Sequence, residues 1–284
     1  MCLTYWVHIK IPGDFFKLVL EKNLKYSSSL WLDKNDDLNT AETNMLELYC
    51  QKAKIIDGQS ILELGCGWGS LTLYLASKYP NCNINAISNS HSQRKFIKEK
   101  IKSKKLTNVK IITANIADLN LNAKYDRILS VEMFDHMKNW ALLLKKVSLL
   151  MNEKAKLFIH IFTHKDLCYH YDHNDPNDWL SKYFFAGGIM PSNNLLLYFQ
   201  DNLTVDEHNV INGRHYQKTA QAWINNMLNN KSEIMTVFND IYGIKESKIW
   251  FNRLLIFFLS CQRLWGYNHG NEWQVSHYLL GLKK

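Results

Sequence analysis

The sequence predicts an α/β fold in which helices cover both faces of a mostly parallel β-sheet. Short apolar segments alternate with amphipathic segments of helical length between residues 60 and 162, and glycines cluster directly after the first apolar segment. The length of 284 residues suits one α/β domain that carries an insertion. Because strands that alternate with helices build parallel sheets, we expect right-handed crossovers throughout this region.

The segments before residue 60 are expected to be mainly helical. Residues 14–25 have the pattern of a helix, and 26–29 have the composition of a loop. An amphipathic helix is expected to begin at Thr40, and the turn signal Asp57-Gly58 follows it.

Five strands and three helices are expected to alternate in the central part of the chain. The expected helices are 68–79, which Pro80 ends, 92–105, and about 140–150. The expected strands are 60–64, 83–88, 109–113, 125–130 and 156–162.

The alternation stops between about 165 and 250, where aromatic residues are frequent. This stretch contains the loop signal Gly187–Pro191, and it is interpreted as an insertion or cap on the sheet. A last strand is expected at 273–282.

Composition limits the classes of partner. The formal net charge is +8, from 34 Lys and Arg against 26 Asp and Glu, but the basic residues are scattered, with short clusters at 98–105 and 145–156. Solvated helix faces explain such clusters, while peripheral contact with anionic membranes stays open as an alternative. We expect no nucleic-acid partner, because the charge is diffuse and no base-flipping motif occurs.

The cysteines and the apolar runs suggest an intracellular protein. Six cysteines form no CxxC pair and no zinc spacing, so free thiols in a reducing compartment are expected. We expect no signal peptide and no transmembrane segment, because the most apolar run, 254–261, is too short to span a bilayer. The expected location is the cytoplasm, and the oligomeric state is left open.

A glycine motif follows the first expected strand and opens the next helix. Gly65, Gly67 and Gly69 permit a tight turn and let a ligand approach the backbone. The spacing GxGxG differs from the GxGxxG of dinucleotide sites, and no P-loop Lys follows. Glu63 suits a ligand that bears an ammonium and a sulfonium better than it suits a pyrophosphate. A tight turn of a nicotinamide-binding fold is the alternative.

Several motifs resemble one enzyme superfamily. Residues 59–69 resemble the first motif of class I methyltransferases, and more narrowly that of the cyclopropane-fatty-acid-synthase and coclaurine N-methyltransferase superfamily. Residues 26–28, 88–93 and 131–139 resemble its Tyr-Ser element, its second motif and its active-site motif. Segments 160–164, 179–200, 213–216 and 272–278 are similar to the coclaurine N-methyltransferase branch in particular.

The resemblance covers about residues 20–284 and implies a fold and a cofactor. It implies one methyltransferase domain over 1–284, Rossmann-like, with a seven-stranded sheet and a helical, aromatic-rich cap. The cofactor core would span about 40–165 and 270–284, and the substrate cap about 166–265 with a contribution from 1–39. The cofactor would be S-adenosyl-L-methionine, with contacts at Tyr26, Ser27, Gly65, Gly67, Asn89, Gln93, Asn115 and Ile116.

The expected chemistry is an in-line displacement at a sulfonium, for which the protein aligns donor and acceptor. An amine acceptor must also lose a proton, which a carboxylate or an imidazole can take. Glu132, Asp135 and His136 lie where ligand clefts of α/β sheets form, after the fourth strand. By resemblance, Asp135 and His136 match an adjacent Glu-His pair that positions and deprotonates the amine, although Asp135 is one methylene shorter. The alternative is that Asp135 caps the following helix.

Other candidates follow from the resemblance and from the aromatic cap, whose rings can bind cations or simply pack. Cys261 matches a cysteine flagged as active in the superfamily, although methyl displacement needs no thiol and a buried helix thiol is the alternative. The histidines 160, 164, 170 and 173 have no ligand spacing, so no metal is expected. The expected substrate pocket contains Glu42, His160, Tyr216 and Phe184.

Three functions remain as hypotheses. The first is N-methylation of a small amine, which the similarity of residues 131–216 to the N-methyltransferase branch favours. The second is modification of an unsaturated acyl chain, for which the synthase branch uses a bicarbonate; Ser28 and Asp135 depart from the residues usual at that site. The third is a non-catalytic protein that binds the cofactor or a partner.

Overall fold

The computed structural model describes residues 11–116, 121–172, 174–175, 178–185 and 187–284. They form two compact units. The sheet unit comprises Leu46–Ile211 and Val275–Lys284, and the helical unit comprises the described residues up to Met45 and Asn212–Gln274.

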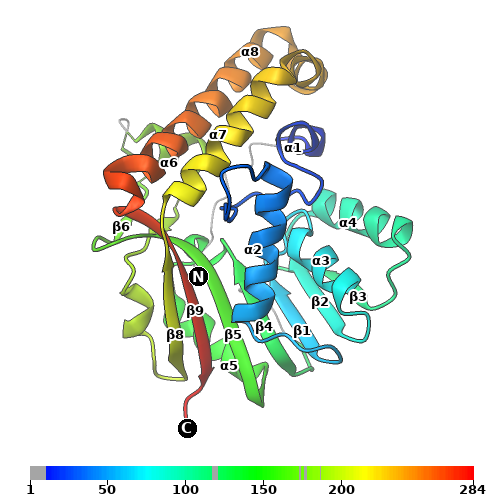
Figure 1. Cartoon of the computed structure of the whole chain (residues 1–284), viewed down its shortest axis with the longest axis vertical. Helices are drawn as coiled ribbons and strands as arrows, with labels where there is room; N and C mark the ends of the chain where they lie inside the picture. Colours follow the sequence, from blue (N-terminus) through cyan, green and yellow to red (C-terminus); the bar gives the residue numbers. More distant parts are fainter. Residues whose placement is uncertain (1–10, 117–120, 173, 176–177, 186) are drawn as a thin grey trace. The chain divides into compact units, whose positions relative to one another are not determined.

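The sheet unit contains a seven-stranded, mostly parallel sheet, which confirms the predicted fold class (Figure 1). Its order is β3-β2-β1-β4-β5-β9-β8; β1 pairs in parallel with β2 and β4, and β8 pairs antiparallel with β9. The first three strands have the predicted bounds, and the fifth is longer than predicted. The strands are β1 Ser60–Leu64, β2 Asn83–Ser88, β3 Val109–Thr113, β4 Tyr125–Val131, β5 Met151–His164, β8 Leu203–Ile211 and β9 Trp273–Leu282.

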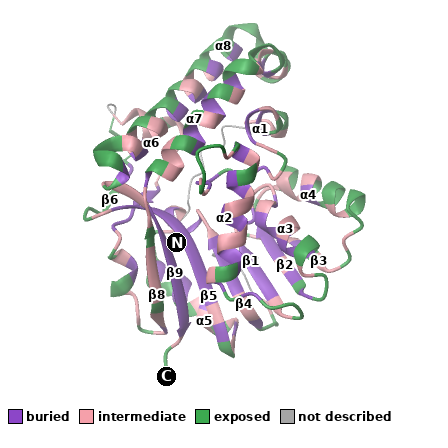
Figure 2. Cartoon of the chain, viewed as in Figure 1, coloured by how far each residue is buried: buried purple, intermediate pink, exposed green. Residues whose placement is uncertain are grey.

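Helices cover both faces of this sheet because successive side chains of a strand point to opposite sides. In β2, Ala86 packs with Ile97 of α4 (His91–Ser103), whereas Ile87 joins the core beneath α5 (Trp140–Leu149). α3 (Ser70–Lys78) follows β1. The longest buried runs of the sheet lie in β5 and β9 (Figure 2).

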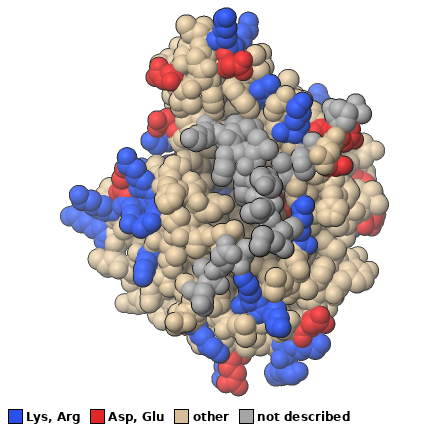
Figure 3. Space-filling model, turned by 180° about the vertical axis from the view of Figure 1, so that it is seen from behind, with Lys and Arg blue, Asp and Glu red and all other residues tan. Residues whose placement is uncertain are grey.

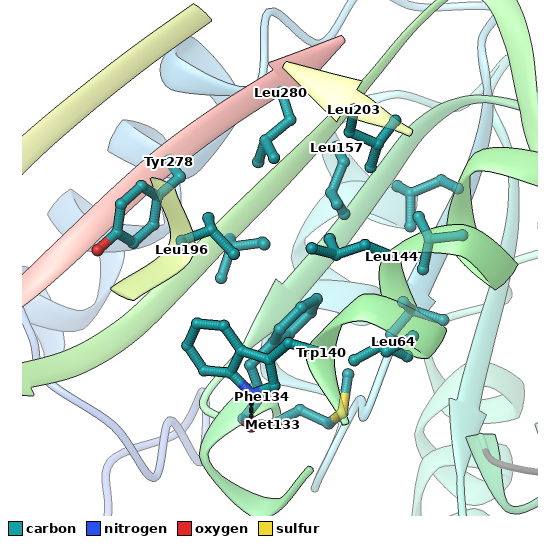
Figure 4. Close-up of a cluster of buried hydrophobic side chains, with 14 of the residues drawn as sticks. Leu64, Met133, Phe134, Trp140, Leu144, Leu157, Leu196, Leu203, Tyr278 and Leu280 are labelled. Atoms are coloured by element: carbon teal, nitrogen blue, oxygen red, sulfur yellow. Dashed lines mark hydrogen bonds between the residues drawn. The ribbon is translucent and has the colours of Figure 1, made fainter. Parts of the chain in front are cut away.

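The core beneath α5 fixes the segment that follows β4 (Figure 4). Phe134 begins a 3₁₀ turn, η2 (Phe134–His136), and its ring meets Trp140 edge to face at 5.6 Å. The Trp140 indole Nε1 donates a hydrogen bond to the Phe134 carbonyl at 2.9 Å. Both rings are buried, so the turn is held against the sheet at its first residue.

Residues 166–211 differ from the predicted helical cap. A two-stranded ladder joins β6 (Tyr169–His170) to β7 (Ile189–Met190), α6 (Trp179–Tyr183) is short, and η3 (Leu195–Tyr198) leads into β8. β8 was not predicted as a strand, because it lies at the sheet edge and buries only Leu203 fully. The stretch therefore belongs to the sheet unit.

The helical unit is built on α7 (Arg214–Asn229) and α8 (Lys231–Gly266), which is kinked at Gly243 with φ 77°. α2 (Leu38–Lys52) contributes its first half to this unit. The helix predicted at 14–25 is shorter, α1 (Gly13–Val19), and it buries Phe15 against Phe238 and Phe258 of α8 at 5.4 and 6.4 Å.

Hydrogen bonds within the helical unit tie its two ends together. The Gly213 amide donates to the Gly270 carbonyl at 2.9 Å, and the Asn212 side chain donates to the His269 carbonyl at 3.1 Å. Gly213 has no room for a side chain, since a Cβ would overlap the carbonyl oxygen of Trp273. The residues that follow β8 and precede β9 therefore meet.

The face drawn in Figure 3 carries side chains of both charges. Basic side chains occur at several separate places on the face drawn in Figure 3, with acidic side chains among them. Within the described ranges, no helix has the length and apolar character required to cross a membrane. The described cysteines, at 50, 66, 82, 168 and 261, are free thiols.

Candidate active site

The glycine loop after β1 adopts backbone angles that favour glycine. Gly65, Gly67 and Gly69 have φ of 79°, 51° and 83°. A Cβ on Gly65 would come within 2.9 Å of Met133, and one on Gly69 within 2.8 Å of Ile97. A Cβ on Gly67 would meet nothing within 4 Å, so this glycine borders open space.

Two polar side chains flank the loop. Ser70, the first residue of α3, has a buried hydroxyl that makes no hydrogen bond to any described residue. Glu63 is buried, accepts a hydrogen bond from the Thr72 hydroxyl, and has a pKa that burial raises to about 7. Glu63 thus anchors α3. The open space at Gly67 and the unbonded Ser70 hydroxyl fit a polar ligand such as S-adenosyl-L-methionine.

Four further predicted cofactor residues lie at the same edge of the sheet. Asn89 and Gln93 follow β2, and Asn115 and Ile116 follow β3. The strands are parallel, so their carboxyl ends meet beside the glycine loop. The Ser88 hydroxyl donates to the Gln93 side chain at 2.7 Å, which ties Gln93 of α4 to the end of β2.

A second group of polar residues follows β4 and begins with Glu132. Its φ of 48° lies in the left-handed region, which a residue with a side chain rarely adopts. Both carboxylate oxygens have partners: His160 Nε2 lies 3.1 Å from Oε1, and the Phe162 amide donates to Oε2 at 3.1 Å. The neighbouring strand β5 therefore fixes the orientation of Glu132.

Asp135 and His136 lie together on η2, with His136 Nε2 3.2 Å from Asp135 Oδ2. Asp135 is only 1% exposed, and its pKa is raised to about 6, mainly by burial; His136 opposes the shift and the Glu132 charge adds to it. No described residue donates a hydrogen bond to Asp135 Oδ1. The capping alternative is wrong, because Asn139 caps α5.

An aromatic cluster stands beside His136. The Phe185 ring stacks on the imidazole, with centroids 6.2 Å apart and planes 15° apart. Phe185 also contacts Phe162 at 5.9 Å and Tyr171 at 5.1 Å. The predicted pocket residue Phe184 packs on Trp179 at 5.4 Å instead. Sequence reasoning missed Phe185, although it belongs to the aromatic run that was singled out.

Two buried side chains contact His160 behind Glu132. Tyr49 Oη lies 3.0 Å and His277 Nε2 lies 2.8 Å from His160 Nδ1. All three side chains are at most 1% exposed. Neither Tyr49 nor His277 was a predicted site residue, because only the fold brings them to His160.

The remaining predicted residues belong to the helical unit. Tyr26 packs on Trp223 at 5.3 Å, and the Lys25 ammonium donates to the Ser27 hydroxyl at 2.7 Å. Tyr216 stacks on Trp265, with centroids 4.7 Å apart.

Glu42 and Cys261 are the ionisable candidates of the helical unit. Glu42 is fully buried, and neither of its oxygens has a hydrogen-bond partner among the described residues. Burial raises its pKa to about 7, and Lys25 opposes that shift. Burial raises the pKa of the Cys261 thiol to about 12, which disfavours a thiolate nucleophile.

Comparisons with known proteins identify a family and several similar N-methyltransferases. The family model described as mycolic acid cyclopropane synthetase matches residues 5–250. The chain is 41% identical to (S)-coclaurine N-methyltransferase of Thalictrum flavum subsp. glaucum, over 96% of this chain and 77% of that protein. It is 37% identical to pavine N-methyltransferase of the same plant, over 96% and 78%.

A solved structure is similar over the same extent. It is coclaurine N-methyltransferase bound to N-methylheliamine and S-adenosylhomocysteine, with a TM-score of 0.92 and 40% identity. The match covers 96% of this chain and 79% of that one.

Proposed function

We propose the reaction that this chain catalyses, and the proposal starts from its family. The chain belongs to the mycolic acid cyclopropane synthetase family. The chain is an S-adenosylmethionine-dependent methyltransferase. The reaction that we propose is N-methylation of a small amine, the class of activity named in the relatives that are 41% and 37% identical to it.

The observation that carries this proposal is the Asp135–His136 pair, with Glu132 and Phe185 beside it. Carboxylates attract an ammonium, and aromatic rings attract a cationic amine through their faces. An acyl chain carries no cationic group for these carboxylates and rings to attract. The site therefore has the composition expected for an amine acceptor.

The cofactor supplies the electrophilic methyl group when it is bound. The amine nitrogen forms the new N–C bond as the C–S bond breaks, and its lone pair must be free for this step. We assign the uptake of the amine proton to the Asp135–His136 pair, because a carboxylate and an imidazole in contact offer two acceptors. Glu132 would orient the nitrogen, since its own oxygens are fixed by β5.

We propose that the glycine loop with Ser70, Asn89, Gln93, Asn115 and Ile116 holds the cofactor in the sheet unit. Gly67 would lie against it, because open space is found there. Tyr26, Ser27, Glu42 and Tyr216 stay proposed ligand-binding residues of the helical unit. The His160 side chain acts instead through Glu132, and Cys261 has no proposed step.

The test is methyl transfer from isotopically labelled cofactor to a panel of secondary and tertiary amines. Phospholipid vesicles with unsaturated acyl chains serve as the competing acceptor. We expect label in one or more amines and none in the lipid. Label in the acyl chains alone would overturn the proposal, and so would cofactor binding without transfer to any acceptor.

A further inference from the structure

A buried chain of hydrogen-bonding groups runs from Glu132 into the interior of the sheet unit. His160 of β5 contacts Glu132 through Nε2 at 3.1 Å, and through Nδ1 it contacts His277 of β9 at 2.8 Å and Tyr49 of α2 at 3.0 Å. The Tyr49 and His277 rings are 5.6 Å apart, and Phe158 packs against both of them. Imidazole and phenol groups are rarely buried together without a hydrogen-bonding reason.

The partners of Glu132 determine which group donates and which accepts in each of these hydrogen bonds. An ionised carboxylate only accepts hydrogen bonds, so the His160 Nε2 beside Oε1 must carry a hydrogen and donate it. The Phe162 amide donates to the other oxygen. A neutral His160 then has one lone pair, on Nδ1, which the Tyr49 hydroxyl and the His277 Nε2–H share as donors.

The placement of Glu132 depends on this arrangement. Its left-handed backbone is strained for a residue with a side chain, so surrounding contacts must maintain it. The other His160 tautomer would present a lone pair to the carboxylate and repel it. Groups that fix the tautomer of one histidine through its second nitrogen commonly control the partner on the first.

We propose that His277 and Tyr49 are positioning residues that hold His160 in its Nε2–H tautomer and thereby aim the Glu132 carboxylate at the acceptor. The proposal rests on the role given to Glu132 in the proposed function. No proton is transferred through these hydrogen bonds in this proposal; they orient the Glu132 carboxylate.

The kinetic test compares His277→Phe with His277→Gln. Phenylalanine removes the hydrogen bond and keeps a ring, whereas the glutamine amide restores a donor. We expect His277→Phe to lower kcat by up to about 100-fold, the effect of a small misplacement at a reacting centre. We expect His277→Gln to recover most of this loss. S-adenosylhomocysteine binding, measured by calorimetry, gives the folded fraction used to normalise kcat.

Tyr49→Phe has a matched control in Tyr278→Phe. Both tyrosines are buried in the sheet unit; the Tyr49 hydroxyl lies 3.0 Å from His160 Nδ1, whereas the Tyr278 hydroxyl donates to the Asn193 carbonyl. We expect Tyr49→Phe to lower kcat several-fold more than Tyr278→Phe at equal folded fraction. Equal losses in the two variants would show that these hydroxyls contribute to stability alone.

A spectroscopic measurement tests the tautomer without any acceptor. The ring-nitrogen signals of His160, assigned through His160→Gln in histidine-labelled protein, should show a protonated Nε2. They should shift in His277→Phe and stay in place in Tyr278→Phe. A protonated Nδ1 with a bare Nε2 in the unaltered protein would overturn the inference. If these signals behave as expected but no amine is methylated, the proposed function has failed and the tautomer assignment has not.

Discussion

The loop after β1 and the segment after β4 meet at one edge of the sheet but are built differently. Between Gly65 and Gly69 the backbone sets the geometry, through positive φ angles and the open space at Gly67. After β4 the side chains set it, because Glu132 is fixed by partners on β5 and Asp135 by His136. A local glycine motif suffices for the first region, whereas the second depends on residues distant in the chain.

The two regions are expected to serve two parts of the reaction, cofactor binding and methyl transfer. A backbone cradle recognises a ligand by shape and leaves little chemistry to any one residue. Buried carboxylates act through their charge, so the replacement of a single carboxylate oxygen is enough to remove their function. Substitutions after β4 should therefore act on the rate, and substitutions in the glycine loop on cofactor affinity.

Asp135→Asn should have the largest effect. The amide keeps the shape of the side chain but accepts no proton, so we expect kcat to fall by about 10²- to 10⁴-fold, the usual contribution of a general base. Steady-state methyl transfer to the best amine measures it. Asp135→Glu should retain most of the activity, because it keeps the carboxylate. A threefold loss or less in Asp135→Asn would contradict the rate role of this region.

Gly67→Ala should act on affinity instead. The added methyl group fills the open space beside the loop, and we expect S-adenosylhomocysteine to bind about tenfold more weakly, or about 1.4 kcal/mol. Gly58→Ala is the matched control, since Gly58 also has a positive φ and no neighbour within 4 Å of a Cβ. Both variants should lose similar stability, about 1–2 kcal/mol. Equal loss of affinity in the two would show that Gly67 does not border the cofactor.

The pH dependence of stability sharpens the description of Asp135. Burial raises its pKa to about 6 from an ordinary value of 3.8, so between these values the folded state binds more protons than the unfolded state. The contribution of Asp135 to stability therefore falls as pH rises through this window, by about 3 kcal/mol at most.

Urea denaturation of the unaltered protein and of Asp135→Asn from pH 4 to pH 7 measures this contribution. The free energy of unfolding of Asp135→Asn relative to the unaltered protein should rise over the window and level off above pH 6. Glu63 and Glu42 are present in both proteins, so their titrations cancel in the difference. A flat difference would mean that Asp135 is solvated.

Cys261→Ser should have the smallest effect. Burial keeps the thiol protonated, and methyl displacement needs no thiolate, so we expect kcat within about twofold of the unaltered protein. The same amine assay measures it. A loss comparable to that of Asp135→Asn would move part of the chemistry to the helical unit.

The central strands and the glycine loop were predictable because each depends on neighbours in the sequence. β1, β2 and β3 are short segments that contain several apolar residues and are bounded by turn residues, and their predicted bounds agree with the structure. β8 was not predictable in the same way, since an edge strand with half-buried side chains has a weak apolar pattern. Helix ends also differed, as at α1, where Leu20 turns to an extended backbone.

The supporting contacts of the candidate site were not predictable from one sequence. Motifs placed Glu132, Asp135 and His136 together, but they gave no sign of His277 beside His160, because 117 positions separate the two. Only the structure distinguishes Phe185 from Phe184, because the Phe185 ring stacks on His136 and the Phe184 ring packs on Trp179. Such pairings depend on register and packing, which local patterns do not encode.

The tied ends of the helical unit have a consequence for the order of folding. β8 and β9 pair with each other, yet residues 212–272 separate them, and closing so long a loop carries a large entropic cost. The Gly213–Gly270 and Asn212–His269 hydrogen bonds form within the helical unit and bring the two strand ends together. Early formation of that unit would shorten the effective loop and speed the β8–β9 pairing. The pairing that brings His277 to His160 would then depend on a helical unit that contains neither histidine.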